Sequence, residues 1–135
     1  MPNPYSNELS LRIEEDIVRV RQAARLAATE AGLSLVDQTK LVTAASELAR
    51  NTVIYGGGGT ARLQILESAG RRGVRIEFED HGPGIADLQL ALTDGYTTGG
   101  GLGLGLSGAK RLCSEFEVRS EVGKGTTVVI TRWKG

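Results

Sequence analysis

Two hydrophobic periods divide this sequence into segments that suit either strands or helices, and the order of the segments limits the possible folds. Five segments alternate apolar and polar residues or are rich in β-branched residues, which predicts strands. Four others have helical spacing or helix-start signals. The predicted strands are residues 8–13, 61–68, 73–80, 115–122 and 126–133, and the predicted helices are residues 14–31, 35–54, 87–92 and 103–112.

Short turns join two pairs of these strands. The turn sequences are AGRRG at residues 69–73 and GKG at residues 123–125. Such turns are typical of hairpins, whose strands are antiparallel. We therefore expect an α/β (α+β) two-layer sandwich, with a mixed, largely antiparallel sheet and the helices on one face.

Four consecutive glycines, residues 56–59, follow the second predicted helix. They suit either a flexible hinge between domains or a tight turn. The chain has 135 residues, and neither half alone would bury a sufficient core. This favours the turn, and we predict a single domain over residues 1–135.

Composition excludes several classes of partner and chemistry. The chain has 16 Lys and Arg and 16 Asp and Glu, so it offers no electrostatic case for nucleic acid or a membrane surface. One cysteine, Cys113, excludes an internal disulfide, and one histidine, His81, disfavours a histidine-based metal site. No signal peptide or membrane-length apolar segment is visible, and we expect a cytoplasmic protein.

The stretch GGGLGLGLSGAKRL, residues 99–112, contains six glycines among fourteen residues. Gly103, Gly105 and Gly108 match G-x-G-x-x-G, but no strand precedes them, and Lys110 lacks the Ser or Thr that follows in a Walker loop. Two interpretations remain, a plain flexible loop and a lid that leads into a helix N-terminus. Leucine at every second position favours the lid, whose backbone N–H groups and helix dipole suit phosphate.

A carboxylate ends the strand that leads into FEDHGPGI, residues 78–85. Asp80 shares the face of the strand that carries its apolar residues. If this is the core face, Asp80 needs a hydrogen-bonded partner, which the amino group of a purine would provide. Gly82 and Gly84 turn the chain beside it. The alternative is an acid that is merely exposed where a strand ends.

The long predicted helix contains SELARN, residues 46–51. Glu47 and Asn51 are four residues apart and share one face. The Asn51 oxygen suits a hard cation such as Mg²⁺, and Glu47 suits general base chemistry one turn earlier. In isolation this pair is more typical of a solvated helix face, but it occurs in order with the two preceding signals.

Together these motifs resemble the Bergerat-fold (GHKL) ATPases, the superfamily of gyrase, Hsp90, histidine kinases and MutL. The resemblance covers nearly the whole chain. Its length and detail are similar to the RsbT-like serine/threonine switch kinases, which regulate bacterial sigma factors. The matching elements, in family order, are Glu47 and Asn51, then Asp80, Gly82 and Gly84, then the glycines of residues 99–105, then Gly125 and Thr126.

The resemblance implies ATP and Mg²⁺ as cofactors and a role for each matched residue. Phosphoryl transfer depends mainly on positioning and charge neutralisation, and Arg50 is a candidate for positive charge, with a solvent-facing arginine or a charge from a partner as alternatives. The implied roles are Asp80 for the adenine amino group, Thr126 beside the adenine, Gly82 and Gly84 for close passage of the chain, Asn51 for Mg²⁺, Glu47 as base toward a serine or threonine hydroxyl, and Gly101, Gly103 and Gly105 for the phosphates.

The resemblance also implies partners. They are STAS-domain proteins (RsbS/RsbR-like) in a stressosome-type complex as phosphoacceptors, a PP2C-type phosphatase (RsbU-like) that the kinase activates, and a second copy in a homodimer. The first alternative is an anti-sigma factor (RsbW/SpoIIAB-like) that binds a sigma subunit and phosphorylates its antagonist. The second is a histidine-kinase catalytic domain, which is disfavoured because His81 lies inside the nucleotide motif.

Overall fold

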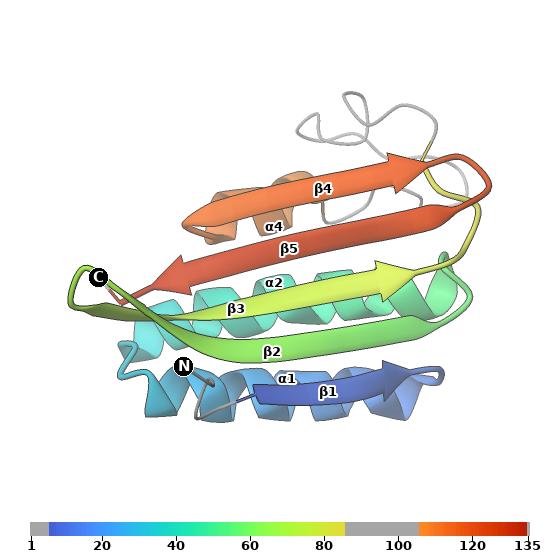
Figure 1. Cartoon of the computed structure of the whole chain (residues 1–135). Helices are drawn as coiled ribbons and strands as arrows, with labels where there is room; N and C mark the ends of the chain where they lie inside the picture. The colour runs from blue at the N-terminus through green and yellow to red at the C-terminus, as the bar shows by residue number, and fades with distance from the viewer. Residues whose placement is uncertain (1–5, 86–105, 135) are drawn as a thin grey trace.

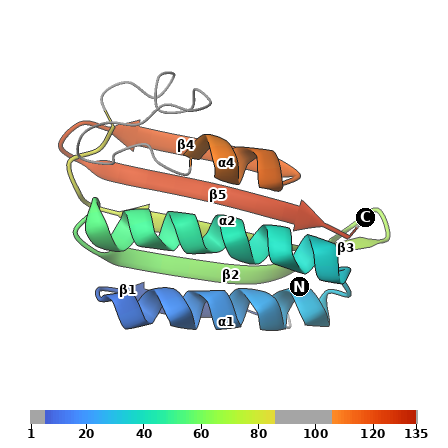
Figure 2. The ribbon, with the colours of Figure 1, turned by 180° about the vertical axis from the view of Figure 1, so that it is seen from behind.

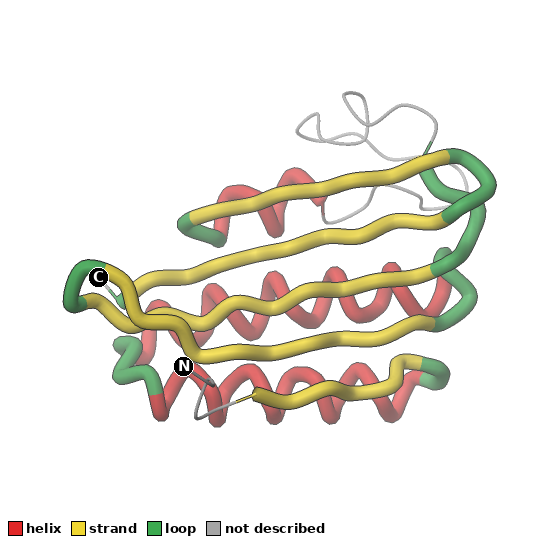
Figure 3. Tube along the Cα trace, in the orientation of Figure 1, coloured by secondary structure: helices red, strands yellow, loops and turns green. Residues whose placement is uncertain are grey.

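The structure, a computed structural model, describes residues 6–85 and 106–134, and these build one five-stranded sheet with helices on a single face (Figures 1 and 2). The strand order is β1-β2-β3-β5-β4. In Figure 3 the strands form one layer and the helices lie behind it. The elements are β1 (Ser6–Leu11), α1 (Glu14–Glu30), α2 (Leu35–Ile54), β2 (Gly59–Ser68), β3 (Arg71–Asp80), α4 (Leu106–Leu112), β4 (Glu115–Glu121) and β5 (Gly125–Trp133).

The predicted two-layer fold is confirmed, with one correction. The sheet was expected to be mixed, but each of the four pairings between described strands is antiparallel. β3 and β4 do run in the same direction, as a crossover connection requires. β5 lies between them and pairs antiparallel with both, so no two neighbouring strands are parallel. The predicted helix at residues 87–92 lies outside the described residues.

The core lies between the sheet and the two long helices. The helix-facing side chains of the central strands are buried, and they follow the period of two that the sequence shows. α1 and α2 meet the sheet mainly through small residues, which lets the two layers approach closely. The central contacts are Leu63, Ile76, Phe78 and Ile130 from the sheet, Val20, Ala24 and Ala27 from α1, and Leu41, Ala45 and Leu48 from α2.

α1 begins at Glu14, and the Asp16 side chain caps this end of the helix. The Asp16 carboxylate accepts the backbone N–H groups of Arg12 (2.8 Å) and Ile13 (3.1 Å) and the guanidinium of Arg19 (3.0 Å). These hydrogen bonds, those from the backbone above all, lower the pKa of Asp16. The other end of the helix agrees with the predicted range of 14–31. Gly32, which follows, has a positive φ of 81°, as is typical just after a helix C-terminus.

Both ends of α2 are held by specific hydrogen bonds. Ser34 Oγ accepts the Asp37 N–H at 3.1 Å, as the predicted cap requires, while the Asp37 carboxylate binds Arg132 of β5 at 2.7 Å. At the other end, Gly58 N–H donates to Thr52 O at 2.9 Å. The four glycines therefore form a tight turn into β2 rather than a hinge. That residues 1–135 form a single domain stays a prediction.

No helix in the described ranges is long and apolar enough to cross a membrane.

Candidate active site

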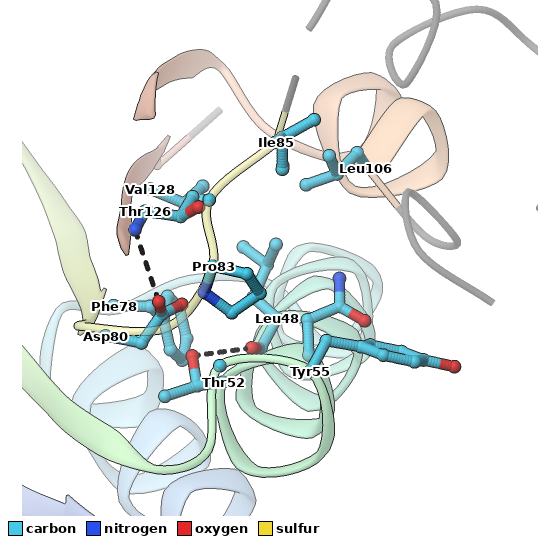
Figure 4. A pocket seen from close by; sticks show the side chains of 13 residues that line it. Leu48, Thr52, Tyr55, Phe78, Asp80, Pro83, Ile85, Leu106, Thr126 and Val128 are labelled. Atoms are coloured by element: carbon cyan, nitrogen blue, oxygen red, sulfur yellow. Dashed lines mark hydrogen bonds between the residues drawn. The ribbon is translucent and has the colours of Figure 1, made fainter. Parts of the chain in front are cut away.

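A pocket opens at the end of the sheet where β3 ends and β5 begins, between α2, the loop after β3 and the start of α4 (Figure 4). Most of the wall that the described residues form is apolar, and among them Asp80 alone contributes a carboxylate. This combination suits a flat ligand with a few polar groups. The lining residues are Leu48, Asn51, Thr52, Tyr55, Gly56, Phe78, Asp80, Pro83, Gly84, Ile85, Leu106, Thr126 and Val128.

Asp80 is the last residue of β3, and described residues hydrogen-bond to only one of its two carboxylate oxygens. Oδ1 accepts the backbone N–H groups of Gly82 at 2.9 Å and Thr126 at 3.2 Å. Oδ2 accepts no hydrogen bond from the part of the chain that the structure describes. A carboxylate held this way at an apolar pocket presents one acceptor to a ligand with an N–H donor.

Backbone segments around Asp80 approach so closely that glycine is required. Gly125 has a φ of +114°, and a Cβ there would run into the Asp80 carbonyl oxygen. Gly84 has a φ of +77°, and its Cβ would run into the carbonyl oxygen of Glu121. These conformations and approaches are open only to glycine. The two glycines therefore allow the ends of β3, β4 and β5 to approach one another closely beside the pocket.

The predicted site residues fall into three groups. Asn51, Asp80, Gly84 and Thr126 line the pocket, and Gly82 donates to Asp80 beside it.

Two predicted residues of α2 lie outside the pocket lining. Glu47 is half-buried one turn before Asn51 and does not line the pocket, and Arg50 is exposed in a groove between α1 and α2 together with Glu15, Val18 and Arg21. Gly101, Gly103 and Gly105 lie outside the described residues.

Sequence reasoning missed most of the apolar wall. Leu48, Thr52 and Tyr55 line the pocket from one side of α2, with the spacing i, i+4, i+7 that places them on one face. This spacing was available in the sequence. Ile85 follows β3, and Leu106 begins α4 (Figure 4). The sequence gives no comparable signal for these two residues, because only the fold brings both to the pocket.

The described residues form no carboxylate, histidine or cysteine cluster for a metal, and the thiol of the single cysteine is protonated. No cluster of three or more His, Cys, Asp or Glu side chains that could hold a metal occurs in residues 6–85 and 106–134. Asn51 lines the pocket, and a side-chain amide oxygen is one of the ligand types that Mg²⁺ accepts beside water and phosphate. Burial raises the pKa of Cys113 to about 12, so its thiol stays protonated.

Comparison with known proteins identifies the class. Residues 36–134 match the family of histidine kinase-, DNA gyrase B- and HSP90-like ATPases, and the chain belongs to this family. Among curated relatives, the serine/threonine-protein kinase RsbT of Bacillus subtilis (strain 168) is 45% identical over 120 residues, which cover 89% of this chain and 90% of the relative. The predicted family and the predicted enzyme class, a serine/threonine-protein kinase, are confirmed.

Two further comparisons are more distant. The anti-sigma F factor of Geobacillus kaustophilus (strain HTA426) is 30% identical over 98% of this chain and 93% of that protein. The crystal structure of the RsbU and RsbW domains of Rv1364c from Mycobacterium tuberculosis matches with a TM-score of 0.64 at 24% identity. The match covers 95% of this chain and 32% of that larger chain, and at this identity it supports the fold alone.

Proposed function

We propose that the chain transfers the γ-phosphoryl group of ATP to a serine or threonine of a STAS-domain regulator in a sigma-factor-controlling pathway. The identity of 45% to RsbT over nine-tenths of both chains carries this proposal. The pocket agrees with it, because its apolar wall suits adenine and Asp80 Oδ2 is an open acceptor for the adenine amino group. Thr126 would lie beside the base, and Gly82 and Gly84 would let the chain pass close to it.

Asn51 and Glu47 are proposed to act at the phosphate end. Asn51 would hold Mg²⁺, which when bound neutralises charge on the phosphates. Glu47 lies one helical turn before Asn51, so its carboxylate is within reach of a group bound near that side chain. There it would orient the incoming hydroxyl and accept its proton as the new oxygen–phosphorus bond forms, while the bond from the γ-phosphorus to the bridging oxygen breaks and ADP leaves. Gly101, Gly103 and Gly105 would donate backbone N–H groups to the phosphates.

The source of further positive charge is open to direct test. Arg50 is one candidate for it, and its side chain lies in the groove between the helices, outside the pocket lining. A partner that binds this groove would change the position of Arg50 or bring its own cation. If Arg50→Ala leaves the turnover rate unchanged, Arg50 has no part in the mechanism.

The proposed setting is the one that the resemblance to RsbT-like kinases implies. We infer a cytoplasmic enzyme whose phosphoacceptors are RsbS/RsbR-like STAS proteins of a stressosome-type complex and which activates an RsbU-like PP2C-type phosphatase. A homodimer belongs to this proposal as well.

A second candidate function is an anti-sigma factor. The observation that favours it is the identity of about 30% to several anti-sigma F factors over nearly the whole chain. In this case the chain would hold a sigma subunit in a complex that depends on nucleotide, and kinase activity would serve to release it.

One experiment separates the two candidates. The protein is incubated with Mg-ATP labelled at the γ-phosphate and, in separate reactions, with a STAS-domain protein encoded nearby and with a sigma factor of the same cell. Glu47→Ala and Asp80→Asn test the site. Glu30→Ala is the matched control, because Glu30 ends α1 and is exposed away from the pocket.

Label on a STAS serine or threonine that is lost in both site variants and kept in the control supports the kinase. Absence of label, together with a nucleotide-dependent sigma complex on a sizing column, contradicts the kinase proposal and supports the anti-sigma factor. Loss of label in Glu47→Ala with unchanged ATP affinity would place Glu47 in the chemical step rather than in binding.

A further inference from the structure

A serine outside the pocket lining connects the segments that form it. Ser120 belongs to β4, is half-buried, and lies behind the pocket wall. Its Oγ accepts the backbone N–H of Ile85 at 2.7 Å and lies 2.8 Å from Thr126 Oγ1 and 3.2 Å from the Gly125 carbonyl oxygen. Three contacts from one hydroxyl thus reach the loop after β3 and the first two residues of β5.

These three contacts can be satisfied at the same time. A serine hydroxyl has one hydrogen to donate and two lone pairs that accept. Ser120 Oγ accepts from Ile85 N–H and from the Thr126 hydroxyl, and it donates to the Gly125 carbonyl. The Ile85 N–H has no second acceptor in the described ranges, so it depends on Ser120.

The network continues to the carboxylate that faces the pocket. Thr126 bonds to Ser120 through its hydroxyl and to Asp80 Oδ1 through its backbone N–H. Ile85 lies five residues after Asp80 and lines the same pocket. Ser120 therefore closes a ring of contacts in which both ends of the loop 80–85 are fixed to β4 and β5. β4 lies at one of the two edges of the described sheet, next to β5, and this hydroxyl connects it to residues that line the pocket.

We propose that Ser120 is a positioning residue for nucleotide binding, which holds Thr126 and Ile85 so that Asp80 Oδ2 and the apolar wall fit the base. This inference rests on the proposed use of the pocket for ATP. Because Ser120 acts on the base end of the site, its loss should weaken ATP and ADP equally and leave the chemical step unchanged. A merely structural serine would lower the melting temperature without this pattern.

The test compares three serine variants by calorimetric titration with ATP and with ADP, and by kinase assay. For Ser120→Ala we expect roughly 10-fold weaker binding of both nucleotides, since the half-buried Ser120 hydroxyl and its hydrogen bonds are lost. The KM for ATP rises by a similar factor, and kcat at saturating ATP stays within about twofold. Ser120→Thr keeps the hydroxyl and restores the affinity. Ser114→Ala is the matched control, because Ser114 Oγ also accepts a backbone N–H, that of Trp133, beside the opposite end of β4.

Asp80→Asn is measured in parallel so that two failures can be told apart. Unchanged affinity in Ser120→Ala, together with loss of binding in Asp80→Asn, overturns the role of Ser120 alone. Unchanged affinity in both overturns the nucleotide site as well. If Ser120→Ala does not fold, Ser120→Cys replaces it, because the thiol has a similar size but accepts weakly. Weaker binding in the Cys variant than in the Thr variant then supports the proposal, and equal binding overturns it.

Discussion

Two aspartates at the same end of the molecule are held by similar backbone hydrogen bonds, and they differ in the surroundings of the second carboxylate oxygen. Asp16 stands at the start of α1, just after β1, and Asp80 ends β3 two strands away. Each accepts two backbone N–H groups with one carboxylate oxygen. The second oxygen of Asp16 accepts Arg19 at 3.0 Å, whereas the second oxygen of Asp80 has no partner in the described chain and faces the pocket.

The difference separates a structural carboxylate from one that awaits a ligand. Asp16 is 6% exposed and fully paired, so its charge stabilises the fold. Asp80 is also held by two backbone hydrogen bonds, but it lines a mostly apolar pocket, and its second oxygen has no partner among the described residues. Unpaired polar atoms beside apolar surface are costly unless a ligand completes them. The comparison predicts that the two residues affect different measurements.

The largest expected effect is on nucleotide affinity in Asp80→Asn. The amide can keep the bonds from Gly82 and Thr126, but it presents N–H groups where the adenine amino group needs an acceptor. A charged hydrogen bond contributes about 1.5–3 kcal/mol, and we expect roughly 100-fold weaker ATP binding by calorimetry. The melting temperature without nucleotide should change little. A large fall in that temperature would contradict the distinction between the two aspartates, because Asp80 would then stabilise the fold as Asp16 does.

The next effect concerns the rim around Asp80. Gly125→Ala places a Cβ on a residue with a φ of +114°, where it meets the Asp80 carbonyl oxygen. We expect the free energy of unfolding to fall by about 2–3 kcal/mol and ATP binding to weaken. Gly123→Ala is the matched control in the same turn. Its φ is +83° and nothing lies within 4 Å of the added Cβ, so the cost is only about 1 kcal/mol. If urea denaturation gives equal losses of unfolding free energy for the two variants, the backbone conformation, and not the close approach to Asp80, determines the cost.

The smallest effect is the pH dependence that Asp16 contributes. Its folded-state pKa is lowered from 3.8, so the ionised form stabilises the protein above pH 3.8, and this contribution is lost as the pH falls below that value. Asp16→Asn should lower the melting temperature by a few degrees at pH 7 and leave ATP affinity unchanged. The difference from the unchanged protein should shrink as the pH falls through the lowered pKa. A constant difference across that range would contradict the assigned cause.

Element types could be predicted from the sequence, and their ends less well. The hairpin between β2 and β3 is an example. The segment AGRRG predicts a turn over residues 69–73, whereas β3 already begins at Arg71. The turn is shorter because Ala69 adopts a φ of +54° beside Gly70 at +79°, which suits a two-residue hairpin. A non-glycine residue in this conformation is uncommon, so sequence rules do not expect it.

The candidate site could be predicted where its residues lie in motifs. Asn51, Asp80 and Thr126 come from three distant segments, and the structure places all three around one pocket. Arg50 could not be placed, because adjacent residues on a helix point about 100° apart, and the fold decides which of them meets the sheet. Ser120 was not predicted at all, since an alternating edge strand offers many polar positions and only the fold brings this one to Ile85.

By itself, the sequence determined the periods that define the strands and helices, and the chemistry available at Glu47, Asn51 and Asp80. These properties are local, because they depend on side-chain type and on neighbours along the chain. The tertiary structure alone decided that β5 enters between β3 and β4, which makes every pairing antiparallel. It also decided which oxygen of Asp80 stays open, since the N–H group of Thr126, 46 residues away, binds the other. Long-range pairing sets both, and no local pattern encodes it.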